Sequence, residues 1–198
     1  MKRLNSNRVL LCLIIVLPLF IVCGISTGAV NIPLTDLYSA VLERISSSNT
    51  ASPHFYQAII FDIRLPRVLL AVFVGSILAV SGAVMQGLFR NPLADPSLIG
   101  VTAGASLGAS LVIVFVVGYQ VPWLNMSLLS IGAFLGGMLA VYLVYSLAKN
   151  PFGTSVAIML LAGIGITALV GSVTGFLEFY ADNEMLRRIS LWRMGGLE

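Results

Sequence analysis

The chain of 198 residues is 58% hydrophobic and only 10% charged, with a formal net charge of +3 and a mean hydropathy of +1.00. A soluble domain of this length needs far more charge to cover its surface, so the composition excludes a soluble protein. The positive residues are scattered rather than clustered, so nucleic acid is not expected as a partner.

The apolar windows are long enough to cross a membrane. Crossing a hydrocarbon core of about 30 Å takes roughly 20 helical residues. Several windows without charge reach that length, and the window 96–148 is long enough for two spans. The alternation of barrel strands is absent, and helices satisfy their own backbone groups in lipid. We therefore predict an all-α integral membrane protein with five transmembrane helices, at about 9–30, 68–89, 98–119, 124–148 and 155–177.

The charges around the first span predict its orientation. Lys2, Arg3 and Arg8 precede it, which places the N-terminus in the cytoplasm. Its apolar stretch is about twice as long as that of a secretory signal, so an uncleaved helix is expected. The later loops show no bias, and several arginines are left outside without a topological reason: Arg44, Arg64, Arg67, Arg187, Arg188 and Arg193.

Two segments outside the spans have amphipathic patterns. In 33–45, one helical face carries Leu34, Leu37, Val41 and Ile45, which is typical of a helix lying at the membrane interface. In 184–193, an apolar stripe stands opposite two arginines, and a second outer interfacial helix is expected there. A loop at 46–53 and a turn at 119–125 complete the predicted layout.

Small residues recur at every fourth position in the predicted spans. Lipid tails are as apolar as leucine, so membrane helices associate through close contact, which small residues at this spacing permit. The pattern predicts a tight bundle but no particular substrate. It comprises Ala71, Gly75, Ala79, Ala83 and Gly87 in span two, Gly100, Gly104 and Gly108 in span three, Gly132 and Gly136 in span four, and Gly163, Thr167, Gly171 and Gly175 in span five.

No catalytic motif fits the chain. The only lysines are Lys2 and Lys149, and neither completes a phosphate-binding loop, so any ATP must be hydrolysed by another polypeptide. Gly-x-Ser-x-Gly occurs around Ser26 and Ser106, but both copies lie in membrane helices and His54 is the only histidine, so a serine hydrolase is rejected. No cluster has metal-ligand spacing, and no predicted span contains an ionisable residue for ion coupling. We expect a permease and not an enzyme.

Arg64 and Arg67 bracket Leu65-Pro66 at the outer mouth of the second span. They could anchor the helix to lipid headgroups. They could equally form a docking site for an acidic partner, because arginine binds carboxylates in a planar, bidentate fashion. Spacing alone leaves both interpretations open.

Several sequence blocks resemble one transporter family. The blocks RLPR, SGAVMQGLFRNPLADPSLIG, TAGASLGA and LWRMGG occur in this order. They resemble the permease subunits of binding-protein-dependent ABC importers (FecCD-type) for iron–siderophore complexes, haem and cobalamin. The resemblance covers nearly the whole chain. The block MQGLFRNPLADPSLIG is most similar to haem permeases, with siderophore permeases close behind.

The resemblance implies a ten-helix permease of the bacterial cytoplasmic (inner) membrane, carrying an iron complex such as haem or a ferric siderophore. A second permease subunit, as a homodimer or a similar chain, would complete the translocation path. A substrate-binding protein would dock outside, and two ATP-binding subunits would hydrolyse ATP inside, so this chain itself would bind no cofactor.

The resemblance also implies roles for individual residues. By motif match, Arg64 and Arg67 would meet acidic residues of the binding protein. Thr154 and Ser155 would lie at the cytoplasmic gate. The small residues Gly163, Gly165 and Gly171 of span five would line the path, although helix packing explains them too.

The sequence departs from the family pattern in its length, because it stops where a sixth span would begin. We therefore expect a single, truncated permease domain, 1–198, that lacks about five helices and the segment that receives the ATPase stroke. Alone, such a chain is not expected to transport. The alternative is a truncated, non-transporting membrane remnant or interaction subunit, able to dock a binding protein without coupling to ATP.

Overall fold

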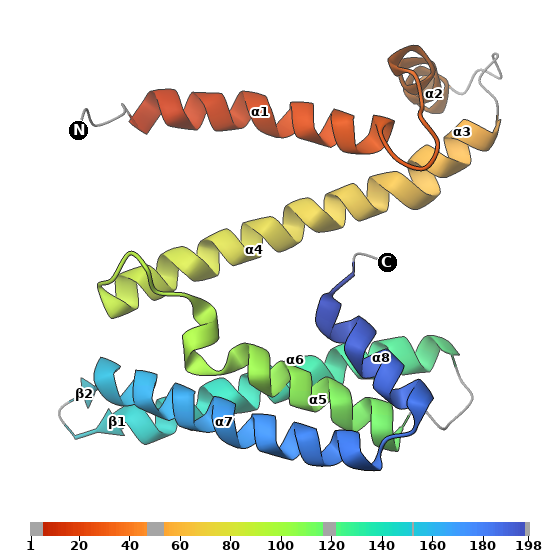
Figure 1. The fold of residues 1–198 in the computed structure, drawn as a ribbon. Helices are drawn as coiled ribbons and strands as arrows, with labels where there is room; N and C mark the ends of the chain where they lie inside the picture. The colour runs from red at the N-terminus through yellow and green to blue at the C-terminus, as the bar shows by residue number, and fades with distance from the viewer. Residues whose placement is uncertain (1–5, 47–53, 117–121, 152, 197–198) are drawn as a thin grey trace. The chain divides into compact units, whose positions relative to one another are not determined.

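The computed structural model describes residues 6–46, 54–116, 122–151 and 153–196. These residues form helices and one very short hairpin (Figure 1). The elements in chain order are α1 (Ser6–Ser26), α2 (Leu34–Ser46), α3 (His54–Ala58), the π-helix η1 (Ile59–Arg64), α4 (Leu65–Phe89), the 3₁₀-helix η2 (Pro96–Ile99), α5 (Val101–Phe115), α6 (Pro122–Ala148), β1 (Lys149–Asn150), β2 (Gly153–Thr154), α7 (Val156–Tyr180) and α8 (Asn183–Met194).

The prediction of an all-α membrane protein is confirmed. Within the described residues, four helical segments are long and apolar enough to cross a membrane: Asn7–Ser26, Phe55–Phe89, Ser127–Ala148 and Val156–Tyr180. The remaining predicted span, 98–119, corresponds to the shorter α5. It begins later than predicted because Pro96–Ile99 winds as a 3₁₀-helix and Gly100 turns the chain with a φ of 75°. Residues 47–53 of the predicted loop and 119–121 of the predicted turn lie outside the described residues, whereas residues 122–125 of that turn already belong to α6.

The second predicted span is preceded by more helix than the sequence suggested. α3, η1 and α4 follow one another without a break from His54 to Phe89, whereas the span was expected to begin at residue 68. Pro66 does not end the helix. A proline lacks an amide hydrogen and its ring crowds the preceding turn. Here the wider π-turn comes directly before it, with the Leu65 amide donating to the Ile60 carbonyl, and this turn accommodates the proline.

The chain divides into two compact units, an N-terminal unit within residues 1–77 and a C-terminal unit within 78–196. The N-terminal unit has a small apolar core in which the end of α1, the following turn, α2 and η1 meet. Its buried residues are Ile25, Ile32, Ala40 and Ile60. The C-terminal unit has a separate core around Met85, Ile99, Val144, Ala148 and Met159. That both units belong to one permease domain, 1–198, stays a prediction.

Helices α5 and α6 of the C-terminal unit pack with their backbones almost in contact. A Cβ added at Gly104 would overlap the backbone of Gly136, and one added at Gly108 would overlap that of Gly132. The glycines of spans three and four therefore permit the close approach that their spacing predicted. In α4, by contrast, a Cβ added at Gly75 or Gly87, both in the predicted series of span two, would meet no atom of another element within 4 Å. The same spacing thus marks a packed face in one helix and an open face in another.

Candidate functional site

Arg64 stands at the end of the π-helix and reaches the C-terminal end of α1. Its Nη1 donates to the carbonyls of Ile25 at 2.6 Å and Ser26 at 3.0 Å, and its Nη2 donates to the carbonyl of Val30. α1 ends at Ser26, so no further helical turn supplies amide donors to its last carbonyls, and among the described residues only the Ile32 amide reaches the Ser26 carbonyl, at 3.1 Å. A positive charge is also favourable at the C-terminal end of a helix. The half-buried Arg64 is therefore engaged within the chain.

Arg67 has a different environment. Its side chain is exposed, and among the described residues it has no hydrogen bond or ion pair. Its guanidinium donors are then free of other described residues and can meet a carboxylate from outside the chain. The two arginines of the RLPR block therefore have different surroundings. Their assignment to partner docking stays a prediction.

The two residues assigned to the cytoplasmic gate lie on the connection between α6 and α7. Thr154 is exposed in β2 and pairs with Lys149 across the short antiparallel hairpin. Ser155 is the N-cap of α7, where its Oγ accepts a hydrogen bond from the Ile158 amide at 3.4 Å. Capping gives Ser155 a structural role whether or not it belongs to a gate.

The three glycines assigned to the translocation path have different surroundings. Gly163 is buried, and a Cβ there would overlap the Leu98 carbonyl and lie 3.1 Å from Cα of Ile99. It therefore allows η2 to lie directly on α7 and does not face an open surface. Gly165 and Gly171 are exposed, with nothing within 4 Å of an added Cβ. Of the three, only these two present open α7 backbone.

A polar cluster at the end of α7 was missed by sequence reasoning. α7 continues to Tyr180, beyond the predicted end at 177, and so includes Glu178. Nη2 of Arg193 lies 2.5 Å from Oε1 of Glu178, and its Nε donates to Oγ of Ser106 at 3.4 Å. Arg193 thus ties α8 to both α7 and α5. The Ser106 hydroxyl is directed to this arginine, which agrees with rejecting a hydrolase.

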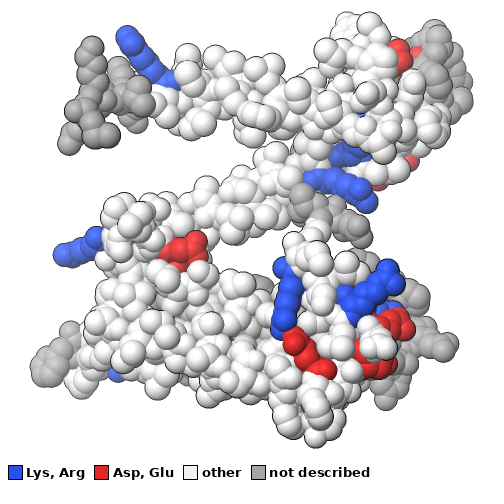
Figure 2. Space-filling model, in the orientation of Figure 1, with Lys and Arg blue, Asp and Glu red and all other residues white. Residues whose placement is uncertain are grey.

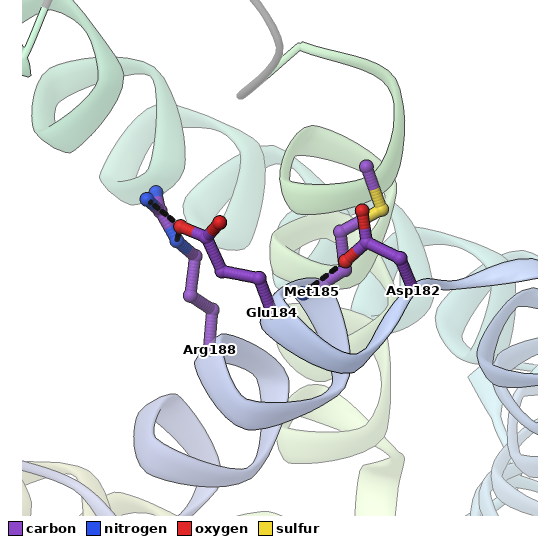
Figure 3. Close-up of polar contacts among 4 residues, drawn as sticks. All are labelled: Asp182, Glu184, Met185 and Arg188. Carbon is purple, nitrogen blue, oxygen red and sulfur yellow. Dashed lines mark hydrogen bonds and ion pairs between the residues drawn. The ribbon is translucent and has the colours of Figure 1, made fainter.

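Three further charged residues at the start of α8 make local contacts. Asp182 caps the helix by accepting a hydrogen bond from the Met185 amide at 2.8 Å, and Arg188 forms an ion pair with Glu184 at 2.6 Å (Figure 3). Figure 2 shows charged side chains gathered on α8, in a unit whose visible surface is otherwise mostly uncharged. The spacing of Glu184 and Arg188 could have predicted their pair, because residues four apart are helix neighbours.

The C-terminal unit also carries an apolar groove of about 620 Å³ beside α5 and α6. Its wall offers apolar and aromatic side chains and few polar groups; it includes Val101, Ala105, Phe134, Met138, Tyr142 and Tyr145. In the part of the chain that the structure describes, no group of three or more His, Cys, Asp or Glu side chains could hold a metal ion.

Comparison with known proteins identifies relatives over nearly the whole chain. The FecCD transport family matches residues 13–198. The hemin transport system permease protein HmuU of Yersinia pestis is 40% identical over 195 residues, which are 98% of this chain and 55% of that protein. The cobalamin import system permease protein BtuC of Halobacterium salinarum is 42% identical over 168 residues, 83% of this chain and 41% of the relative.

Two further proteins are similar over most of this chain. The molybdate import system permease protein MolB of Haemophilus influenzae is 39% identical over 140 residues, 70% of this chain and 40% of the relative. A solved structure of a putative metal-chelate type ABC transporter in an inward-facing conformation superposes with a TM-score of 0.76 at 30% identity, covering 97% of this chain and 54% of that one. The chain spans about half the length of the curated relatives it matches.

Proposed function

The chain belongs to the FecCD transport family, and we propose that it forms part of the membrane permease of a binding-protein-dependent ABC importer for an iron complex. The observation that carries the proposal is the 40% identity to a hemin permease over 98% of the chain. The iron complex is haem or a ferric siderophore. Because two relatives are named as permeases for cobalamin and molybdate, a test must distinguish an iron complex from these two cargoes.

The energy for import comes from other subunits in this proposal. The chain has no lysine in a phosphate-binding loop, so separate ATP-binding subunits hydrolyse the ATP. A second permease subunit, in a homodimer or as a similar chain, completes the path, and an extracytoplasmic substrate-binding protein delivers the cargo. The permease lies in the bacterial inner membrane with its N-terminus in the cytoplasm, which is supported by Lys2, Arg3 and Arg8 ahead of α1.

Helix α2 lies at the outer membrane surface in this proposal. Leu37 packs against the core of the N-terminal unit, whereas Leu34, Tyr38 and Ile45 are 62%, 68% and 76% exposed. The exposed apolar side of α2 therefore differs from the apolar face predicted from the sequence, because that face included Leu37, which is packed against the core. An exposed apolar stripe within a few residues of a membrane span is suited to lipid. We propose that α8, which contains the predicted interfacial helix 184–193, also lies at the outer membrane surface.

The gate and path assignments follow the same family resemblance. Thr154 and Ser155 lie at the cytoplasmic gate, on the connection before α7. Gly165 and Gly171 line the translocation path, where their open backbone leaves room for a bulky cargo. Gly163 is assigned to helix packing instead, because η2 covers it.

An uptake experiment tests this function. Residues 13–198 would replace the matching part of the Yersinia pestis hemin permease in its complete transporter, in cells lacking their own haem permease. Uptake of haem by the chimera supports the proposal. Uptake of cobalamin or molybdate without any iron complex would refute the cargo. A chimera that inserts normally, yet imports none of these, would refute the permease assignment.

A further inference from the structure

We propose that the apolar groove beside α5 and α6 binds one acyl chain of an anionic phospholipid, and that Lys149 holds the phosphate of the same lipid. The inference goes beyond the proposed function. It needs only that these helices span a membrane, and it requires neither an iron cargo nor a particular orientation of the chain.

Small residues open the groove where α5 and α6 meet. Ala105 of α5 and Ala133 and Gly137 of α6 are among the residues that line it. Gly137 is buried, and a Cβ added there would lie 3.3 Å from the Val101 carbonyl oxygen and 3.6 Å from Cβ of Ala105. A larger side chain at these positions would therefore occupy the space between the two helices.

Larger side chains line the groove from its exposed side. Phe134, Met138 and Tyr142 recur at every fourth position of α6 and are 64%, 52% and 64% exposed. Residues four apart share one face of a helix, so these three form a continuous apolar row along α6. In a membrane this row faces hydrocarbon, and a groove left empty there would lose its dispersion contacts.

The dimensions of the groove favour an acyl chain over a helix. Phe134 and Tyr145, both in its wall, are about 16 Å apart along the axis of α6. This is close to the depth of hydrocarbon in one leaflet, about 15 Å. Over that length the groove volume gives a mean cross-section of about 40 Å², whereas a helix with its side chains, about 10 Å across, needs roughly 80 Å². A helix could press only side chains into the groove, but a linear acyl chain can lie along it.

A positive charge follows the end of the groove. Tyr145 lies one turn before the end of α6, where an aromatic ring with a hydroxyl suits the membrane interface. Lys149 comes four residues later, in β1, and is exposed. Its ammonium group has no hydrogen bond or ion pair with another described residue. A phosphate above an acyl chain in the groove would therefore meet a free cation at headgroup level.

The other charges at this end of the C-terminal unit leave it positive. Phe89 at the end of α4 packs against the core that contains Ala148, so the neighbouring Arg90, which is exposed, lies at the same end as Lys149. The one described carboxylate between α4 and α5 is Asp95, whose oxygen accepts the Ser97 amide at 2.7 Å. Two cations against one acid favour an anionic lipid over a neutral one.

Photoactivatable lipids test the site in the full chain. The chain is placed in nanodiscs of phosphatidylcholine that contain a small share of phosphatidylglycerol or phosphatidylcholine with a diazirine in one acyl chain, and mass spectrometry locates the adducts. Labelling at Met138 and Tyr142 should exceed labelling at Leu135 and Leu139, which are exposed on α6 outside the groove. Phosphatidylglycerol should label the groove about fivefold more than phosphatidylcholine, the effect expected of one lysine near an anionic headgroup.

Two substitutions separate the acyl chain from the headgroup. Lys149→Gln should lower phosphatidylglycerol labelling to the level of phosphatidylcholine, whereas Arg8→Gln, the same kind of change at an exposed cation of α1, should leave it unchanged. Ala105→Phe fills the groove and should lower labelling by both lipids. Ala168→Phe, on an exposed face of α7, is its matched control and should change neither.

Three results would overturn the proposal. Equal labelling of the groove and of Leu135 and Leu139 would remove the acyl-chain site. A preference for phosphatidylglycerol that is absent from the unchanged chain, or that persists in Lys149→Gln, would remove the role of Lys149. A benzoylphenylalanine incorporated in place of Met138 that crosslinks mainly to a second copy of the chain, and not to lipid, would show that a polypeptide occupies the groove. None of these measurements needs cargo or ATP, so their failure leaves the importer proposal standing, and haem uptake by the chimera decides that proposal separately.

Discussion

The two units hold their helices together in different ways. In the C-terminal unit, α5 and α6 approach through four glycines, and their backbones are the contact surface. In the N-terminal unit, the end of α1 is joined to η1 by a small apolar core and the hydrogen bonds of one guanidinium. The glycine contacts are repeated along α5 and α6, whereas the hydrogen bonds at the end of α1 come from the single side chain of Arg64. A repeated contact leaves a sequence pattern, whereas a concentrated one leaves none.

Both arrangements answer the same physical problem. Lipid tails are as apolar as the helices themselves, so burial of leucine drives little association within a membrane. Close backbone packing gains dispersion contacts over many atoms, and a charged hydrogen-bond donor gains strong local bonds. Because the glycine contact is backbone against backbone, it has the least room to adjust, and the largest mutational effect is expected there.

Gly108→Leu should cause the largest loss of stability in the C-terminal unit. Its added atoms would overlap the backbone of Gly132, which no rotamer change can relieve, so α5 and α6 must separate. We expect a loss of about 3 kcal/mol, at the upper end of the usual cost of overpacking. Denaturant unfolding in detergent measures it. Gly165→Leu, on an open face of α7, is the control, and equal stability of the two variants would show that the glycine interface is unimportant.

Substitution of Arg193 or Glu178 tests whether the attachment of α8 in the C-terminal unit also depends on a guanidinium group. Glu178→Gln should loosen α8 by about 1 kcal/mol, because both side chains are partly solvated and the ion pair is screened. Limited proteolysis in the α8 segment measures the loosening. Arg193→Gln should have a similar effect, and the double variant should cost little more than either single variant. A fully additive double variant would contradict a direct interaction.

The sequence predicted the periodic features of this fold and missed the single long-range contacts. The helices at 9–30, 124–148 and 155–177, and the packing of Gly104 and Gly108, follow from patterns repeated over several turns. The bond from Arg64 to Ile25 joins residues 39 positions apart, and the pair of Arg193 and Glu178 likewise depends on how α8 folds back. No local spacing encodes either contact.

The charge-free window also placed the start of the second helical span too late. The second span was predicted to begin at residue 68, where the charge-free window begins, yet the helix runs through Pro66, a residue type that usually interrupts one. The π-turn of η1 absorbs the disruption, so the continuous helical segment already begins at His54. Arg64 and Arg67 were singled out by their chemistry and the other candidate residues by family resemblance, whereas the surroundings of Arg64 depend on a backbone detail that propensity does not reveal.

Ser155→Ala should have a smaller effect than loss of the Arg193 pair. The cap stabilises the start of α7 through one long hydrogen bond, at 3.4 Å, so a cost of about 0.5 kcal/mol is expected. Thr154→Ala is the neighbouring control and should cost nothing measurable, because the exposed Thr154 makes no side-chain hydrogen bond to another described residue. Thermal unfolding in detergent compares them. A larger loss in Thr154→Ala would contradict capping as the main structural task of this pair.

Acidification should produce the smallest effect, at Asp95 in the connection between α4 and η2. The Ser97 side chain and the Ser97 amide, whose nitrogen lies 2.7 Å from the carboxylate, lower the pKa of Asp95 below its ordinary value. A lowered folded-state pKa stabilises the fold above the unfolded-state pKa, and the contribution disappears as pH falls through the folded value. The loss should therefore occur below about pH 4.

Asp95→Asn separates the charge from the hydrogen bond. The amide oxygen can still accept the Ser97 amide, so the variant should keep η2 while losing the acid-dependent step in unfolding midpoint below about pH 4. An unchanged acid step would mean that another carboxylate causes it. Asp95 is fully exposed and caps one short helix, whereas Arg64 is half-buried and serves three segments. Asp95→Asn should therefore change amide hydrogen exchange near its site less than Arg64→Ala does near the end of α1. Similar changes in the two variants would mean that burial and multiple hydrogen bonds do not strengthen the contacts of Arg64. The contrast between the two units would then depend on glycine packing alone.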